Sequence, residues 1–414
     1  MPAGSPAGEW SQARAAERLS SRPLGGAFRF HMTPSIRCAL SCSALVIAVA
    51  CICPTSRQLS PTPTTPPPAK PSASPAPGES PSPPSEKEVL GAVVLVERGS
   101  LYRIDIRCDA LMLDCDGVSS QLVASPAIYT SPSWSPDGRE IAFSSDLHQR
   151  GSDVLGVFVV GESGGEPTRL SEAGHDPDWS PTGEELAFAT WEGGGRIMLT
   201  SLEGVSRIAI EFPFASRPRW SPEGSRIAFV GDPSATGSQS KECLYVYYLR
   251  DQVLELVACQ PIGFLQWSPE GDRIAFTAAN ADGLQLFVVT VGTVPGSIGE
   301  PQLAPASGSV SYPAWSPDSR EIASVSRDQG IEDVHVATLD CESASGTCQI
   351  TTRPITDQPT TETEPLWFPD SDHLAYLAGS GSSWRLELVD LDGLRSQVVF
   401  HGLTSPHSLD GFIR

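Results

Sequence analysis

The stretch Pro132–Ser145 reads PSWSPDGREIAFSS and joins a tight turn to two strand-like segments. Its SPDG core supplies a hydroxyl that can bond the turn backbone, a proline for the first turn angle, an aspartate for the second and a glycine for a positive φ. The IAF segment alternates a large, a small and a large side chain, which is the period-two pattern of a buried strand. The stretch therefore predicts a β-hairpin packed between neighbouring sheets.

The chain repeats this motif six times. The copies are PSWSPDGREIAFSS at Trp134, PDWSPTGEELAFAT at Trp179, PRWSPEGSRIAFVG at Trp220, LQWSPEGDRIAFTA at Trp267, PAWSPDSREIASVS at Trp315 and PLWFPDSDHLAYLA at Trp367. Successive tryptophans are 45, 41, 47, 48 and 52 residues apart. A period of this size, with several short strands in each unit, is typical of the blades of a β-propeller.

Single positions of the motif have mechanical roles. The proline two residues before the tryptophan has no N–H for a ladder, so we expect it at the start of a strand. The tryptophan is large enough to fill the gap between neighbouring sheets, and its burial contributes about 3 kcal/mol. Ser319 and Ser371 replace the turn glycine in two copies. We expect less favourable turns there.

The remaining sequence completes the blades. Residues 154–165 and 167–173 illustrate the third and fourth strands of one period. Residues 91–125 supply three strands ahead of the first motif, and residues 402–414 are long enough for one more. We predict an all-β propeller over residues 89–414 with seven four-stranded blades, in which the C-terminal strand joins the N-terminal blade and removes the exposed sheet edges. Six blades, with the N-terminal strands outside the ring, are the alternative.

The N-terminal region has the pattern of an export signal. Arg37 precedes twelve uncharged residues, Ala39–Ala50, which are too few to span a bilayer and fit the hydrophobic region of a signal peptide at residues 32–50. The signal ends IAVAC at Cys51 and resembles a bacterial lipobox, although Ala48 stands where leucine is usual. We expect lipidation of Cys51. The alternative is an ordinary cleaved signal.

Two further segments flank this signal. Residues 51–88 are rich in proline and serine and predict a disordered tether of partly polyproline-II character. Such a tether suits a domain anchored to the bacterial membrane, in the periplasm or at the cell surface. Residues 1–31 do not fit a signal peptide, and we expect Met32 to be the natural start.

Six cysteines lie in the folded region as three pairs that are local in sequence, namely Cys108 with Cys115, Cys243 with Cys259, and Cys341 with Cys348. Six cysteines allow fifteen pairings, and we predict the three local disulfides, which require an oxidising compartment. No pair has the CxxC spacing of a zinc or thioredoxin-type site, and no histidine lies nearby at ligand spacing. We therefore expect no metal and no cofactor.

Charge excludes one class of partner. Residues 87–414 hold 21 lysines and arginines against 45 aspartates and glutamates. A domain this acidic is repelled by the phosphate backbone, so we do not expect nucleic-acid binding. We expect a soluble monomeric domain.

The repeated WSPDG and IAF motifs resemble those of the TolB-type, or WD-like, propeller family, and the likeness covers about residues 89–414. The resemblance implies the propeller fold. Its members include the periplasmic TolB protein, which binds protein partners, and the propeller domains of prolyl-oligopeptidase-type enzymes. The resemblance therefore leaves both binding and catalysis open.

Sequence support for catalysis is weak. The segment GESGG at Gly161–Gly165 satisfies the GxSxG nucleophile pattern, but we expect it in the hairpin between the third and fourth strands of a blade. The histidines form no local ligand motif. We assign no catalytic residue, and keep as the alternative a hydrolase or lyase that uses histidines or carboxylates, such as Asp176 and Glu364, in the central funnel.

Binding residues are expected where the inner strands begin, at one mouth of the channel. Positions beside the constant proline and tryptophan differ from blade to blade, as a specific site requires; they are His175, Asp176, Arg217, Arg219, Phe264, Gln266, Tyr312 and Glu364. Solvated loop residues without a ligand are the alternative interpretation. The mixture of charged, aromatic and histidine side chains suits a protein or peptide partner in the cell envelope, or a glycan.

Overall fold

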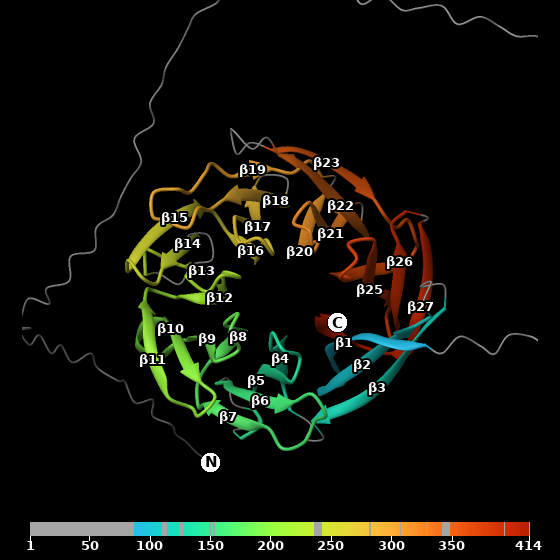
Figure 1. Cartoon of the computed structure of the whole chain (residues 1–414), viewed down its shortest axis with the longest axis horizontal. Coiled ribbons are helices and arrows are strands. Elements are labelled where there is room, and N and C mark those ends of the chain that lie inside the picture. The colour runs from blue at the N-terminus through green and yellow to red at the C-terminus, as the bar shows by residue number, and fades with distance from the viewer. Residues whose placement is uncertain are drawn as a thin grey trace, which may run out of the picture.

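The computed structural model describes residues 87–413, apart from residues 110–113, 124–126, 149–150, 152–153, 236–241, 281–282, 307, 329, 342–347 and 393. Their strands form seven four-stranded antiparallel sheets arranged as blades around one axis (Figure 1). This confirms the seven-bladed propeller and excludes the six-bladed alternative. The predicted signal peptide, Cys51 and nearly all of the tether lie outside the described residues.

Each blade has its innermost strand at the channel. From the second blade onward these strands are β4 (Tyr129–Trp134), β8 (His175–Trp179), β12 (Ser216–Trp220), β16 (Ile262–Trp267), β20 (Ser309–Trp315) and β24 (Thr361–Trp367). The second strands are β5 (Glu140–Ser145), β9 (Glu185–Thr190), β13 (Arg226–Gly231), β17 (Arg273–Asn280), β21 (Glu321–Asp328) and β25 (His373–Ser380).

The outer half of each blade follows in chain order. The third strands are β6 (Gly156–Gly161), β10 (Arg196–Ser201), β14 (Cys243–Tyr248), β18 (Gly283–Thr290), β22 (Ile331–Cys341) and β26 (Ser383–Asp390). The fourth strands are β7 (Thr168–Ser171), β11 (Ser206–Glu211), β15 (Val253–Cys259), β19 (Gln302–Leu303), β23 (Cys348–Pro354) and β27 (Arg395–Leu403). One 3₁₀ turn, η1 (Glu192–Gly194), lies between β9 and β10.

The first blade closes the ring. Its order is β28 (His407–Ile413), β1 (Glu88–Glu97), β2 (Ser100–Cys108) and β3 (Cys115–Val123), so the C-terminal strand is innermost and pairs with β1. The buried Glu97 carboxylate holds the segment before β28, because it accepts hydrogen bonds from the backbone N–H groups of Thr404 and Ser405, both at 3.1 Å. The predicted closure is confirmed.

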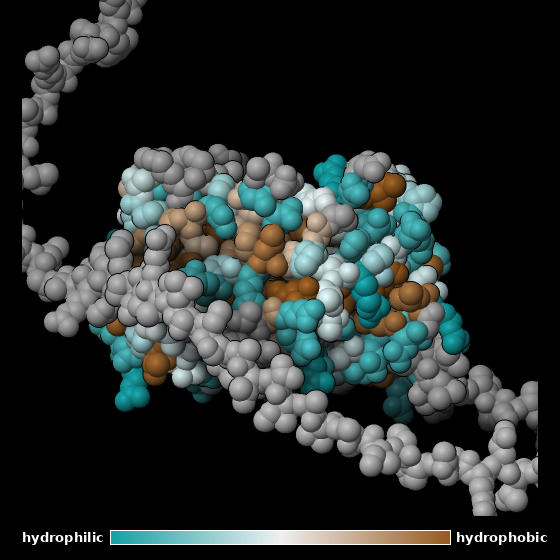
Figure 2. Space-filling model, turned by 90° about the horizontal axis from the view of Figure 1, so that it is seen from above, coloured by the Kyte–Doolittle hydropathy of each residue, from teal (hydrophilic) through white to brown (hydrophobic). Residues whose placement is uncertain are grey.

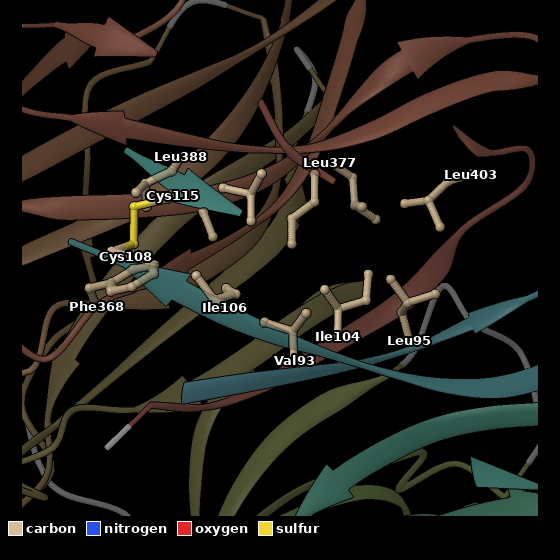
Figure 3. Packing of buried hydrophobic residues seen from close by; sticks show 13 residues of the cluster. Val93, Leu95, Ile104, Ile106, Cys108, Cys115, Phe368, Leu377, Leu388 and Leu403 are labelled. Atoms are coloured by element: carbon tan, nitrogen blue, oxygen red, sulfur yellow. A yellow bond between two sulfur atoms is a disulfide. The ribbon is translucent and has the colours of Figure 1, made fainter. Parts of the chain in front are cut away.

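Seven apolar clusters, one at each blade interface, form the core of the described residues. In β5, Ile141 and Phe143 pack toward the first blade, whereas Ala142 packs with Trp179 of the third. The small residue of the IAF segment therefore makes room for the tryptophan of the next blade. Figure 3 shows the cluster between the seventh and first blades, where Val93 and Ile104 face Leu377.

The indoles of four motif tryptophans, Trp179, Trp267, Trp315 and Trp367, also form hydrogen bonds across the interfaces. The indole Nε1 of Trp179 donates to the carbonyl of Ser133 at 3.0 Å, and that of Trp367 donates to Ala314 at 2.9 Å. Each acceptor stands immediately before the tryptophan of the preceding blade. The tryptophan thus fills the gap between neighbouring sheets, as predicted. Its hydrogen bond also fixes the position of one blade along the channel axis relative to the next.

The position predicted for the motif proline was wrong. The proline lies inside the inner strand, which begins two to four residues earlier. In β4 the register shifts between Thr130 and Ser133, and Pro132 lies in the resulting β-bulge. A bulge leaves one residue out of the ladder, so the missing N–H of proline costs no hydrogen bond there.

The turns behave as the sequence predicted. The Ser135 hydroxyl accepts a hydrogen bond from the backbone N–H of Glu140 at 3.0 Å, across the SPDG turn. Gly138 has a φ of 65°, and Ser319 and Ser371 have φ values of 60° and 61° at the equivalent positions. These serines are held in a conformation that L-residues disfavour.

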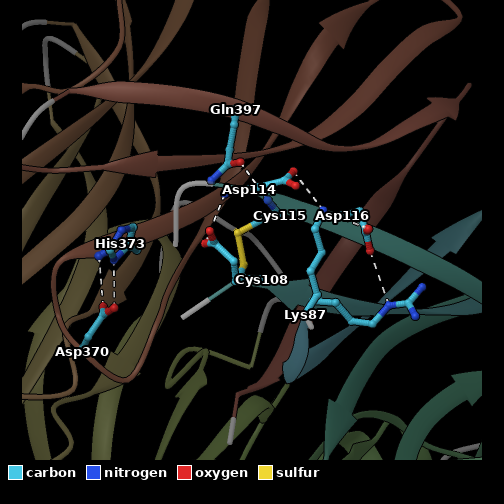
Figure 4. Close-up of a disulfide and its surroundings, with 10 residues drawn as sticks. Lys87, Cys108, Asp114, Cys115, Asp116, Asp370, His373 and Gln397 are labelled. Atoms are coloured by element: carbon cyan, nitrogen blue, oxygen red, sulfur yellow. Dashed lines mark hydrogen bonds and ion pairs between the residues drawn. A yellow bond between two sulfur atoms is a disulfide. The ribbon is translucent and has the colours of Figure 1, made fainter. Parts of the chain in front are cut away.

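All three predicted disulfides are present, and each joins the third and fourth strands of one blade: Cys108–Cys115, Cys243–Cys259 and Cys341–Cys348. The first lies beside the seventh blade (Figure 4), where Gln397 accepts a hydrogen bond from the backbone N–H of Cys115 at 3.0 Å. Lys87 forms ion pairs with Asp114 and Asp116 beside it, at 2.9 and 3.1 Å. These bonds fix the end of the blade at which the chain enters the ring.

The edge of the ring seen in Figure 2 carries hydrophilic residues interspersed with small hydrophobic patches. Across the residues that the structure describes, we find no helix with the length and hydrophobicity needed to cross a bilayer.

Candidate functional site

The eight predicted binding residues all lie on the inner strands, Arg219 and Gln266 next to last in their strands and the other six in the first or middle part; we call this set the rim. Four of them, Asp176, Arg217, Tyr312 and Glu364, have φ values of 51–53°, as does Ser131 at 49° in the second blade. Each stands immediately before the motif proline, inside the β-bulge that the register shift produces. A positive φ costs a non-glycine residue about 1 kcal/mol or more, and such strain is common at functional sites.

Asp176 is the centre of a polar group on the second and third blades. Its carboxylate accepts a hydrogen bond from the Ser131 hydroxyl at 2.9 Å and contacts Nδ1 of His175 at 3.1 Å. Burial raises the pKa of Asp176, but His175, Arg219 and Ser131 together outweigh it and hold that pKa at about 2. The carboxylate is therefore ionised at every physiological pH.

Arg217 and Glu364 join neighbouring blades at the rim. The Arg217 guanidinium donates to the backbone carbonyl of Ile262 at 2.7 Å and pairs with Glu242 at 2.9 Å. Glu364 accepts hydrogen bonds from the backbone N–H groups of Ser408, at 3.0 Å, and Leu409 in β28. Burial raises the pKa of Glu364, and these two N–H groups oppose the rise.

Phe264 and Tyr312 form the aromatic part of the rim. Their ring centroids lie 4.4 Å apart across the fifth and sixth blades, and Phe264 remains 36% exposed. Burial raises the pKa of the Tyr312 phenol, and the nearby Glu364 carboxylate raises it further. Tyr312 is thus a neutral hydrogen-bonding group beside an exposed apolar ring.

Gln266 and Arg219 occupy the position just before the motif tryptophan. Gln266 accepts a hydrogen bond from the backbone N–H of Trp315 in the next blade at 3.0 Å. Sequence reasoning missed the equivalent Asp178 and Asp410, which accept in the same way from Trp220 at 2.7 Å and from Trp134 at 2.8 Å. Aligning the C-terminal HSLDG with the motif would have found Asp410.

The positive charge of Arg219 acts to lower the pKa values of Asp178 and Asp410. Burial raises the pKa of Asp178, and the Arg219 charge opposes that rise. Burial raises the pKa of Asp410 to about 6, with Asp178 raising it further and Arg219 lowering it. Arg219 therefore lies among carboxylates that already link neighbouring blades.

Sequence reasoning also missed Trp191 and Phe214, which lie beside the rim. Trp191 is 57% exposed and stacks on His175 with ring centroids 4.5 Å apart. Phe214 is 37% exposed and lies 6.4 Å from Trp191. A tryptophan after the second strand, where the other copies have small or polar residues, was the available signal.

The arrangement does not form a nucleophilic triad. Asp176 stands between Ser131 and His175, so the serine hydroxyl bonds to a carboxylate rather than to a histidine base. The GESGG segment lies at the hairpin between β6 and β7, as predicted. Within the described ranges, no cluster of three or more His, Cys, Asp and Glu side chains is placed to bind a metal ion.

Comparisons with known proteins identify the fold. No family model and no curated protein matches the sequence. Similar solved structures include TolB from Acinetobacter baumannii, at 15% identity and a TM-score of 0.43, covering 78% of this chain and 82% of that one. A prolyl endopeptidase has 13% identity and a TM-score of 0.52, covering 78% of this chain and 50% of that one. Oligogalacturonate lyase from Vibrio parahaemolyticus has 10% identity and a TM-score of 0.52, covering 78% of this chain and 88% of that one.

The similarities to the prolyl endopeptidase and the lyase support the propeller scaffold and nothing finer. The last two structures match over the ring, and their names refer to different activities. Because all three identities are far below 25%, function must be argued from this chain's own residues.

One buried acid near the rim gives the domain a predicted pH dependence. Glu362 in β24 is fully buried and contacts the Thr356 hydroxyl. Burial raises its pKa to about 7; Thr356 opposes the rise, and the Asp333 and Glu387 carboxylates add to it. The folded protein therefore holds a proton on Glu362 that the unfolded chain releases above pH 4.5, so stability falls as pH rises from about 4.5 to 7.

Glu362→Gln removes this titration. We expect the variant to match the native chain near pH 5 and to exceed its free energy of unfolding by about 2 kcal/mol at pH 8. Urea unfolding at both pH values measures the difference, with the exposed Glu300→Gln as the matched control. An equal effect of Glu362→Gln at pH 5 and pH 8 would show that its titration does not contribute.

Proposed function

We propose that this protein is an exported recognition propeller that binds a protein or peptide partner at the rim. The observation that carries the proposal is the asymmetry of the rim. Phe264 and Tyr312 present an aromatic pair on the fifth and sixth blades, whereas Asp176 and Ser131 present polar groups on the third and second. Partially exposed aromatic residues beside hydrogen-bonding groups are typical of protein interfaces.

Export and anchoring belong to the same proposal. The three disulfides agree with an oxidising compartment, and the signal and lipobox patterns ahead of Cys51 agree with a lipid anchor. β1 begins at Glu88, and Gly91 near its start pairs with Ile413 at the end of β28, so the chain enters at the mouth opposite the starts of the inner strands, where His175, Asp176 and Arg217 of the rim lie. A tether attached there would leave the rim facing away from the membrane.

Catalysis by funnel carboxylates has less support. Asp176 and Glu364 are the acids that this alternative requires. Both already accept hydrogen bonds from neighbouring blades. A general acid needs a proton to donate and a general base needs a free lone pair, whereas these carboxylates are held as structural acceptors.

A photo-crosslinking experiment tests partner binding. Benzoylphenylalanine placed at Tyr312 in the full chain is expected to give a discrete adduct in the native envelope, whereas the same residue at Leu256, exposed on the outer strand β15, is not. Adding Phe264→Ser should reduce the adduct at Tyr312 at least tenfold, because truncating an interface anchor commonly costs about 2 kcal/mol. Equal labelling at both positions, or no adduct at Tyr312, would refute the proposal.

A further inference from the structure

A cleft of about 230 Å³ lies beside the rim, between the second and third blades. Leu155 and Gly174 supply its apolar lining, and His175, Trp191 and Glu192 supply its aromatic and charged lining. Gly174 has to remain a glycine, since a Cβ there would lie 2.5 Å from the Phe188 ring. This edge of the cleft therefore packs directly on the core.

Trp191 forms one wall of the cleft. His175 stacks on it at 4.5 Å with a 27° angle between the rings, yet more than half of the Trp191 surface stays exposed. The following residues Gly193, Gly194 and Gly195 all have positive φ. A Cβ at Gly195 would lie 2.5 Å from the backbone nitrogen of Phe214, so this turn packs closely and fixes where Trp191 stands.

The polar groups around Trp191 favour a positively charged ligand. Glu192 is an exposed carboxylate in the cleft lining, and the ionised Asp176 carboxylate contacts Nδ1 of His175 at 3.1 Å. In the neutral ring, the bond between Nδ1 and Asp176 places the ring proton on Nδ1, so that Nε2 carries a lone pair. Nε2 is buried and has no hydrogen-bond partner among the residues that the structure describes. An N–H donor from a ligand would satisfy it.

We propose that this cleft binds an arginine side chain of the partner. The guanidinium lies over the exposed indole of Trp191, pairs with Glu192 and donates to Nε2 of His175, while its stem packs on Leu155. The acidic excess of residues 87–414, 45 carboxylates against 21 basic side chains, favours the approach of a basic segment. The inference rests on the proposed function and specifies the chemistry of the partner.

The test uses two peptides that differ in one charge. Acetyl-Gly-Ala-Arg-Ala-Gly-amide and its citrulline counterpart are titrated into the full chain labelled with 5-fluorotryptophan, and the Trp191 ¹⁹F signal is assigned from Trp191→Phe. We expect a saturable shift with the arginine peptide, in the millimolar range expected of a single subsite. Binding should be at least tenfold weaker with citrulline.

Variants check each contact. Glu192→Gln, a change to an exposed side chain, should weaken binding of the arginine peptide about three- to fivefold. The control Glu300→Gln should leave that affinity unchanged. Raising the ionic strength from 0.05 to 0.5 M should weaken binding of the arginine peptide by a similar factor, because salt screens exposed charges.

Three outcomes would overturn the inference: equal binding of the citrulline peptide, no response to the arginine peptide, or a saturable response to the neutral oligosaccharide cellotetraose instead. An adduct at Tyr312 without an arginine response would refute this subsite alone. Loss of both would refute the proposed function as well.

Discussion

Replacing Arg226 by alanine is expected to lower the free energy of unfolding by about 3–5 kcal/mol. The side chain is only 1% exposed and joins the fourth blade to the fifth. Its guanidinium donates to the backbone carbonyls of Val291 at 2.9 Å and Gly271 at 2.7 Å, and to the Glu223 carboxylate at 2.7 Å. Removal takes the guanidinium donor away from the two backbone carbonyls in a buried interface, and that loss dominates the effect, whereas Glu223 keeps its hydrogen bonds from the Ser221 and Ser225 hydroxyls.

The Arg226 guanidinium also lies 4.6 Å from the centroid of the Trp267 ring. Arg226→Met keeps much of this packing and should lose less stability than Arg226→Ala. Urea unfolding with the disulfides intact measures both, and the exposed Arg320→Ala should change stability by less than about 0.5 kcal/mol. An Arg226→Ala transition that coincides with that of the native chain would contradict the assigned role.

Gly411→Trp is expected to destabilise the domain by about 3 kcal/mol, although it restores the repeat. Gly411 occupies in β28 the position that a tryptophan holds in the other six inner strands, since it pairs with Val93 as Trp134 pairs with Ile141. A Cβ atom at Gly411 would already lie 2.0 Å from Cδ2 of Leu366. Leu366 therefore fills the space that an indole would need.

A size exchange checks this explanation. Leu366→Ala should be destabilising alone, and the pair Leu366→Ala with Gly411→Trp should recover at least half of the loss of Gly411→Trp, because the indole enters the vacated space. Urea unfolding of the four proteins gives the coupling energy. A Gly411→Trp chain as stable as the native one would show that the repeat pattern, and not Leu366, governs this interface.

Much of the fold was predictable because its signals are local. The SPDG turn and the IAF strand depend on residues within about ten positions of one another, and six copies gave the blade period. The disulfides lie at hairpin-scale separations of 7, 16 and 7 residues. The proline was misplaced because its missing N–H is compatible with a bulge as well as with the start of a strand, and only backbone register separates the two.

The site was only partly predictable. Variation beside constant positions led to Asp176, Arg217, Tyr312 and Glu364, and these share the bulge conformation. Trp191 could have been noticed as a tryptophan where the other copies have small or polar residues, but its stacking on His175, sixteen positions earlier, depends on the path of the loop after β9.

The sequence by itself determined the blade unit, because turns and adjacent antiparallel strands are set by neighbouring residues, and it predicted the strand that closes the ring. Only the tertiary structure decided between seven and six blades and how the blades meet: Asp176 with Ser131, Phe264 with Tyr312, and Leu366 in the space that a seventh motif tryptophan at Gly411 would need. These partners are about 45 residues apart, and their contact depends on the angle and height at which one rigid sheet packs on the next.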